Sequence, residues 1–121
     1  KWPEAEPAIF SNVSASLQYV AVLGHDEKLP KEIEDKIMML SRDEDEFLDY
    51  RNGIIAYAVK AYDRKWHAYE QYILEHNCIE AMVAYAQDVM GRRWPEAEAL
   101  LKADPGVWEF YARKLGIGKE G

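Results

Sequence analysis

Apolar residues recur along this chain at the three- and four-residue spacing that places them on one face of an α-helix. One such stripe consists of Ile79, Met82, Val83, Ala86, Val89 and Met90, and Gly91 is placed to end it. Similar stripes lie in residues 47–61 and 107–115. Residues 13–23, which Ser11 or Asn12 is placed to cap, carry apolar residues on most sides, as expected of a helix buried between neighbouring units. Threonine is absent and alanine is abundant, and this composition favours helix over sheet. The pattern predicts an all-α chain.

The last of these stripes is flanked by helix start and stop signals. Pro95 stands where a short helix would begin, because a proline at the first helical position loses no hydrogen bond, and this helix is expected to run to about Lys102. Asp104 and Pro105 then provide an N-cap and the first position of a second helix. Gly116 is placed to end that helix in the left-handed conformation. The end of the chain is therefore predicted to form a helical hairpin.

Two further helix starts are predicted from capping-box spacing, in which a small polar residue is followed three positions later by glutamate. One pair is Asn77 with Glu80, and the other is Ser41 with Glu44. The stretch after Ser41 contains Gly53, and a glycine inside a helix costs only about 1 kcal/mol. The sequence therefore leaves open whether this stretch forms one long helix or two.

The chain contains an internal repeat. Residues 1–6, KWPEAE, recur as residues 93–98, RWPEAE, and in both copies a tyrosine follows the tryptophan by 17 residues and a glycine follows the tyrosine by five. Two degenerate copies between them open at Leu29 and Trp66 and keep a Tyr-Ala pair in their second half. The predicted units span approximately residues 1–27, 28–63, 64–91 and 92–121, with an insertion near residues 41–53.

Each unit contributes one large apolar residue near its start and one tyrosine in its second half. These structural repeat positions are Trp2, Leu29, Trp66 and Trp94, and Tyr19, Tyr57, Tyr85 and Tyr111. A hairpin of about 26 residues cannot bury its apolar face alone, whereas stacked copies can. The sequence thus predicts one domain, a short α-solenoid or a bundle of about four tandem helical hairpins, with seven to nine helices.

The unit resembles a helical repeat found in proteins of tailed bacteriophages, in which copies of R-W-P-E-A-E, D-P, Y-A and G follow one another. The last copy matches through residues 93–98, Asp104-Pro105, Tyr111-Ala112 and Gly116, and the first copy matches through residues 1–6 and Tyr19. The resemblance implies a repeat fold and a phage or viral origin. It implies no established activity and no catalytic residues.

The formal net charge is −7, and most of it comes from residues 31–49, which hold eight acidic and three basic side chains. An acidic chain is a poor candidate for binding the phosphate backbone of nucleic acid, which needs Lys and Arg. The strongest local run, and the candidate partner-binding site, consists of Asp43, Glu44, Asp45, Glu46 and Asp49. This run could dock a basic protein, mimic nucleic-acid charge or hold a divalent cation, although it lacks EF-hand spacing. Its simplest interpretation is an acidic first turn at a helix N-terminus.

Other candidate sites have simpler structural interpretations. The repeated tryptophans could form a row of binding anchors, but a residue that recurs in every unit is expected to fill the seam between units. The basic residue before each of them is expected to pair with the glutamate that follows. His67, Glu70 and His76 would have to converge to make a metal site, which needs three or four ligands. Cys78 lies at a helix start, which can lower a thiol pKa, but no catalytic partner set accompanies it.

The chain carries no Gly-rich phosphate loop, no H-E-x-x-H and no G-x-S-x-G, so no enzyme class is indicated. We therefore expect a non-enzymatic protein-interaction module in the cytoplasm (the host cytoplasm if phage-encoded). Its expected partner is a protein of basic character, and no cofactor, metal or membrane is expected. The alternatives are a nucleic-acid-binding helical repeat, a self-associating structural protein, and a hydrolase or metal enzyme built between the helices.

Overall fold

The computed structural model describes residues 4–9, 11–23 and 28–117, and within these ranges the chain is helical and contains no strand. Its elements are α1 (Glu6–Ile9), α2 (Val13–Leu23), α3 (Lys31–Leu40), α4 (Glu44–Ala61), α5 (His67–Glu75), α6 (Ile79–Ala84), the π-helix η1 (Tyr85–Met90), α7 (Pro95–Leu101) and α8 (Pro105–Lys114). The η1 segment continues α6 without a break. The all-α prediction is confirmed, and the eight α-helices of the described ranges fall within the predicted seven to nine.

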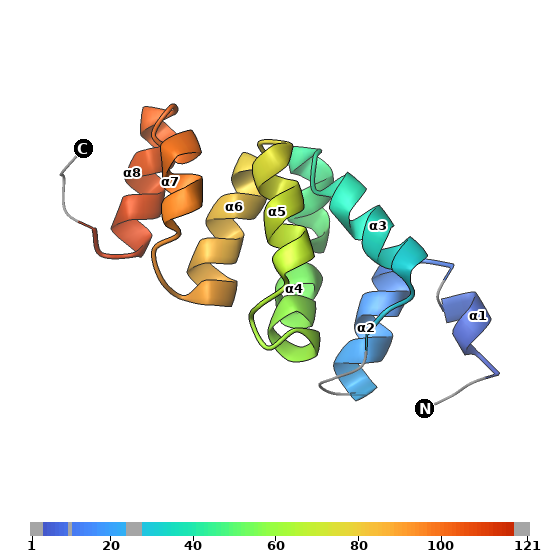
Figure 1. Cartoon of the computed structure of the whole chain (residues 1–121). Helices are drawn as coiled ribbons and strands as arrows, with labels where there is room; N and C mark the ends of the chain where they lie inside the picture. The colour runs from blue at the N-terminus through green and yellow to red at the C-terminus, as the bar shows by residue number, and fades with distance from the viewer. Residues whose placement is uncertain (1–3, 10, 24–27, 118–121) are drawn as a thin grey trace.

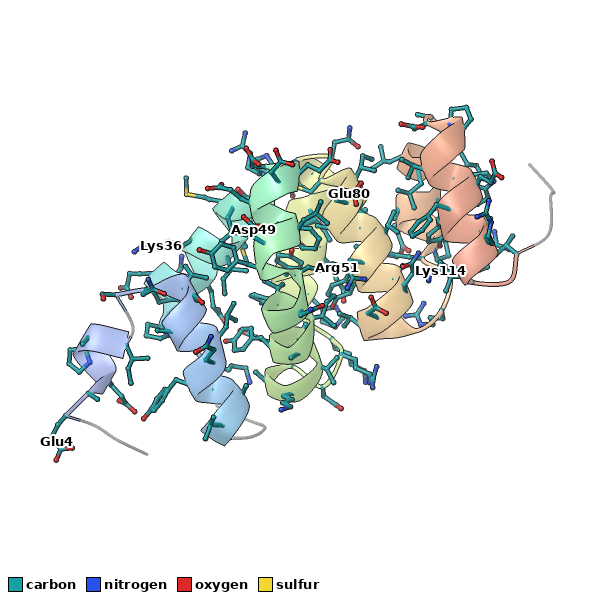
Figure 2. The ribbon with its side chains drawn as sticks, turned by 180° about the vertical axis from the view of Figure 1, so that it is seen from behind. Glu4, Lys36, Asp49, Arg51, Glu80 and Lys114 are labelled. Atoms are coloured by element: carbon teal, nitrogen blue, oxygen red, sulfur yellow. The ribbon has the colours of Figure 1, made fainter. Side chains whose placement is uncertain are left out.

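Consecutive helices pair as hairpins, and the pairs follow one another from one end of the molecule to the other (Figure 1). The second helices α2, α4 and α6–η1 lie side by side, and α8 follows them on the face that Figure 2 shows. The first helices α3, α5 and α7 lie behind them in that view. The first turns of α4, α6 and α8 therefore share one edge of the molecule, at the top of Figure 1.

A tyrosine hydroxyl ties the two helices of a hairpin together. Tyr85, where α6 passes into η1, accepts a hydrogen bond from the backbone N–H of Trp66 (3.0 Å) and donates one to the carboxylate of Glu70. Trp66 directly precedes α5, so the hydroxyl satisfies one of the N–H groups that a helix start leaves unpaired. The same pair of bonds joins Tyr57 to Leu29 and Glu34, and joins Tyr111 to Trp94 and Glu98. In the first hairpin, Tyr19 donates to Glu6.

Aromatic rings fill the seams between hairpins. Trp66 packs edge-on against Tyr57 of the preceding hairpin, with 5.1 Å between ring centroids, and Trp94 contacts Tyr85 at 5.4 Å. These tryptophans are 1% and 3% exposed. Each of these two tyrosines therefore bonds the backbone of its own hairpin through its hydroxyl and contacts the next hairpin through its ring. The corresponding Trp2 lies outside the described residues.

The π-helix η1 accommodates one extra residue. Gly91 follows Tyr85 by six residues, whereas Gly116 follows Tyr111 by five. A π-helical turn holds one more residue than an α-helical turn, and the N–H of Gly91 accordingly bonds the carbonyl of Ala86, five residues back, at 2.9 Å. Both glycines then adopt the left-handed conformation, with φ of 66° at Gly91 and 70° at Gly116. The predicted glycine stops are confirmed at both positions.

The stretch that the sequence left undecided forms one helix. α4 runs for 18 residues and passes through Gly53 without interruption. A Cβ at Gly53 would lie 3.1 Å from Cδ1 of Leu17, which is closer than ordinary van der Waals contact. The glycine therefore allows α2 to pack closely against α4 and does not break the helix.

The two predicted capping boxes are wrong. The N-cap of α4 is Asp43, whose carboxylate accepts a hydrogen bond from the N–H of Glu46 at 3.0 Å. Ser41 is instead buried at the end of α3, where its hydroxyl bonds the hydroxyl of Tyr69 at 2.7 Å. Asn77 has a φ of 54° and follows the end of α5 in the left-handed conformation, which asparagine tolerates, so it cannot cap α6.

The other predicted helix starts are confirmed. The side chain of Asn12 accepts a hydrogen bond from the N–H of Ala15 at the start of α2. Asp104 caps α8 by accepting from two backbone N–H groups of its first turn. Pro95 is the first residue of α7. Side chains that cap a helix in its own first turn could therefore be read from sequence, because the bond is local.

The tyrosine tie predicts a large effect from a small substitution. We expect Tyr85→Phe to lower the free energy of unfolding by about 1–3 kcal/mol, because the buried N–H of Trp66 would lose its acceptor. The matched control is Tyr72→Phe, since Tyr72 is half-buried and its hydroxyl makes no hydrogen bond within the described residues. Urea denaturation of both variants measures the difference, and equal losses would contradict a special role for the tie.

The close contact at Gly53 predicts a second stability effect. We expect Gly53→Val to destabilise the protein by about 1–3 kcal/mol through overpacking against Leu17. Valine is a better helix former than glycine, so helix propensity alone predicts the opposite sign. The control is Asn52→Val at the neighbouring exposed position of α4. Thermal or urea unfolding separates the two explanations, and a stabilised Gly53 variant would show that α2 is free to move away.

Candidate functional site

The acidic run predicted from sequence lies at the start of α4. Asp43 is the N-cap, the next three acids fill the first turn, and all of them are exposed. The helix macrodipole favours carboxylates at this position, which accounts for much of the run. Asp49 lies more than a turn further on and lines a hollow between α2 and α4. Within the run, Glu44 and Asp49 therefore line different hollows.

A groove of about 420 Å³ runs along the α6–η1 helix, between α4 and α8, and is called the α6 groove below. Its lining consists of Leu48 and Arg51 from α4, Glu80, Val83, Ala84, Gln87 and Asp88 from α6–η1, and Phe110, Lys114 and Leu115 from α8 and its end. Figure 2 shows Arg51 and Lys114 on either side of the α6–η1 helix and Glu80 near its start. Three second helices thus contribute to one concave surface.

The walls of the α6 groove expose large apolar side chains. Leu48 from α4 is 47% exposed and Phe110 from α8 is 48% exposed. Each stands next in sequence to a core residue, Phe47 or Tyr111, and so falls outside the buried stripe of its helix. A single exposed apolar residue is ordinary, but two that face a common groove form a surface suited to a partner. Sequence reasoning missed them because no pattern along the chain relates α4 to α8.

Some polar side chains of the α6 groove have a partner within the fold and others do not. Arg51 and Asp88 form an ion pair across it, from α4 to η1. The side-chain nitrogen of Gln87 is buried and has no hydrogen-bond partner among the described residues. Burial raises the pKa of Glu80, the negative charge of Glu44 raises it further, and only Arg51 opposes this shift. The surroundings of Glu80 therefore disfavour its ionised form on balance.

A second hollow of about 380 Å³ continues from the same glutamate and is called the acidic hollow below. Its lining is Ser41, Arg42, Glu44, Asn77, Cys78, Ile79, Glu80, Asp104 and Val107. It lies where the first turns of α4, α6 and α8 meet, which brings three carboxylates and one guanidinium together. Glu80 lines both hollows, so the apolar α6 groove leads directly into an acidic region.

The repeated large apolar residues are placed in the core. Leu29, Trp66 and Trp94 are 5%, 1% and 3% exposed and fill the seams, so they are not available as binding anchors. Each of them is bonded through its backbone N–H to the tyrosine of its own unit. Their recurrence is explained by packing that every hairpin needs.

The predicted pairing of a basic residue with the glutamate of its unit occurs in the last hairpin. Arg93 donates two hydrogen bonds to Glu98, at 2.8 Å and 2.7 Å. These bonds hold the pKa of Glu98 below its ordinary value, although burial acts in the opposite direction. The equivalent Lys28 instead donates to the carbonyl of Ala61, and Lys65 makes no ion pair with a described residue. The recurring glutamate accepts a hydrogen bond from the tyrosine in three hairpins, whereas its pairing with the preceding basic residue is present in the last hairpin.

The remaining candidates are not brought together. His67 begins α5 and lies 3.3 Å from Glu70, whereas His76 stands beyond the opposite end of that helix, its ring against Tyr72. Within the part of the chain that the structure describes, no group of three His, Cys, Asp or Glu residues is placed to hold a metal ion. Cys78 is a buried free thiol, and burial raises its pKa, contrary to the lowering considered from its place at a helix start.

Comparison with known proteins finds no family model, no curated sequence and no solved structure that matches this chain. Among the described residues, none of the helices combines the length and the apolar character required to cross a lipid bilayer.

The bonds to Glu98 predict a pH-dependent stability difference. The pKa of Glu98 is lowered on folding from its ordinary value of 4.5, so the carboxylate stabilises the fold above that pH and the contribution is lost as pH falls through the lowered pKa. We expect Glu98→Gln to be less stable than the unmodified protein at pH 7, with a gap that narrows below pH 4.5. Urea denaturation at several pH values measures it, with the exposed Glu96→Gln as control. A gap that stayed constant with pH would contradict the ionic contribution.

Proposed function

We propose that this chain is a non-enzymatic protein-interaction module that binds a partner protein through the α6 groove. The observation that carries the proposal is the pair of exposed apolar residues, Leu48 from α4 and Phe110 from α8, that line one groove of about 420 Å³. Protein interfaces concentrate their binding free energy in such central apolar contacts, surrounded by polar groups. The groove lining has this arrangement, with Arg51, Glu80, Asp88 and Lys114 around the apolar walls.

The chemistry of the α6 groove supports binding more than catalysis. Among the described residues that line it there is no histidine, cysteine or hydroxyl side chain to serve as a nucleophile or base. Of its two carboxylates, Asp88 is paired with Arg51. Glu80 also lines the acidic hollow, where burial raises the pKa of the Cys78 thiol and so disfavours its nucleophilic thiolate form. A surface that holds and orients a partner needs none of these groups.

Nucleic-acid binding is the weaker alternative. The net charge is −7, and several of the cations that could form a basic face are engaged in the fold. Lys28 and Arg64 donate to backbone carbonyls, and Arg93 is held by Glu98. Phosphate binding draws its affinity from Lys and Arg that are free to displace counterions.

The repeat pattern supports a wider proposal about origin and shape. We propose that the hairpins build a short α-solenoid of phage or viral derivation, acting in the cytoplasm of the host. The support is the recurring K/R-W-P-E-A-E motif together with the tyrosine tie that recurs from one described hairpin to the next. Short solenoids present extended surfaces of this kind to protein partners.

The proposal predicts loss of partner binding from two surface changes. We expect Leu48→Glu combined with Phe110→Glu to reduce capture of partner proteins from a nuclease-treated lysate by at least about tenfold, because buried apolar anchors dominate interface energetics. Met39→Glu is the matched control, since Met39 is an exposed apolar residue (64%) on α3, outside the α6 groove. Circular dichroism confirms that the variants fold. Capture that survives the double substitution, or that depends on intact nucleic acid, would refute the proposal.

A further inference from the structure

We infer that the occupant of the α6 groove is an amphipathic helix of a partner protein that carries a Lys or Arg one helical turn from its apolar anchor. In this arrangement the apolar side chain lies between Leu48 and Phe110, and the basic side chain lies against Glu44 and Glu80. The inference rests on the proposed function and specifies the chemistry of the partner. It moves the binding determinant away from most of the acidic run that the sequence singles out.

The apolar half of the groove defines where the anchor sits. Leu48 lines it from α4, Phe110 lines it from α8, and Val83 and Ala84 line it from α6. The two walls are each about half exposed, at 47% and 48%, so a side chain inserted between them would remove apolar surface from water on both sides. Anchors in pockets of this kind are the residues whose truncation costs most binding free energy.

The acidic hollow, which adjoins the α6 groove at Glu80, sets the charge expected of the partner. Glu44, Glu80 and Asp104 line the acidic hollow, and the cation of its described lining is Arg42. The like charge of Glu44 and partial burial both act against the ionised form of Glu80. A Lys or Arg from a partner would compensate this excess, and an acidic or phosphate-bearing partner would increase it.

The geometry of the two halves sets the spacing in the partner. Glu44 and Leu48 are four residues apart on α4, and Glu80 and Ala84 are four residues apart on α6. The carboxylates of the acidic hollow and the apolar residues of the α6 groove are therefore separated by one helical turn, about 5–6 Å along the helix axes. Residues three or four apart in a partner helix lie on one face at this separation. Lys114 lines the far end of the groove, so the basic end of the partner is directed toward Glu80.

The test begins with a yeast-displayed library of short helical peptides selected on the full chain. Peptides retained by the unmodified protein and lost by Leu48→Glu with Phe110→Glu are sequenced and measured by fluorescence anisotropy. We expect an enriched Lys or Arg three or four positions from a large apolar residue. We expect Glu44→Gln with Glu80→Gln to weaken these peptides by about tenfold or more. The matched control is Asp45→Asn with Glu46→Gln, which removes the same charge from the same edge outside the two hollows.

A charge exchange tests the contact itself. We expect Glu80→Lys to abolish binding of a selected peptide, and replacement of the peptide's basic residue by Glu to restore at least about tenfold of the loss, since the two charges couple directly. Peptides that depend on Leu48 and Phe110 but not on Glu44 and Glu80 would overturn this inference and leave the proposed function standing. A library that yields no groove-dependent peptide would overturn both. Concentration-dependent sedimentation abolished by the same apolar substitutions would identify a second copy as the occupant and overturn the basic-helix inference.

Discussion

The fold depends on one hydroxyl group per hairpin. In the hairpins α3–α4, α5–α6 and α7–α8, a tyrosine of the second helix accepts the backbone N–H of a residue just before the first helix and donates to a glutamate in that helix's first turn. The N–H would otherwise be an unpaired donor in a buried position, because Trp66 and Trp94 are almost completely enclosed. The same tyrosine ring contacts the next hairpin's tryptophan in two of the seams. Local helix capping and hairpin-to-hairpin packing are thus carried by the same side chain.

This tie explains why the unit tolerates insertions. The residue that donates the N–H and the tyrosine that accepts it are 17 apart in the last hairpin, 19 apart in the third and 28 apart in the second. Extra residues are accommodated at the helix turn between the two helices, or in a longer α4, while the two bonded ends keep their positions. The π-helical turn in η1 does the same for one residue between Tyr85 and Gly91. The units therefore keep the same hydrogen bonds between their two helices while the number of residues between the bonded positions varies.

Local signals predicted the helices better than contacts between them. Asn12 and Asp104 were identified as N-caps because each bonds N–H groups in its own first turn, and Gly91 and Gly116 as stops because a positive φ favours glycine. Ser41 and Asn77 have the spacing of a capping box but do not cap a helix. The Ser41 hydroxyl bonds the hydroxyl of Tyr69, and Asn77 adopts a positive φ after the end of α5. The sequence does not indicate that Leu48 and Phe110 line one groove. They are more than half the chain apart, and they line the same groove only because α4 and α8 flank α6. Sequence therefore describes what a hairpin needs and leaves out what neighbouring hairpins create.

The charge of the groove is itself a consequence of the hairpin order. The helices α4, α6 and α8 begin at the same edge (Figure 1), and a helix start favours acids because of its macrodipole and unpaired N–H groups. Asp43 and Asp104 accept hydrogen bonds as N-caps, and this structural role is enough to explain why they lie at the edge. Glu80 also lies in the first turn of its helix, but its side chain caps nothing, lies partly buried between two hollows and has its ionised form opposed by a neighbouring carboxylate. Helix capping accounts for an acidic edge, but it does not account for a glutamate one turn from a pair of exposed apolar walls. That combination is the part of the surface for which a partner is the better physical explanation.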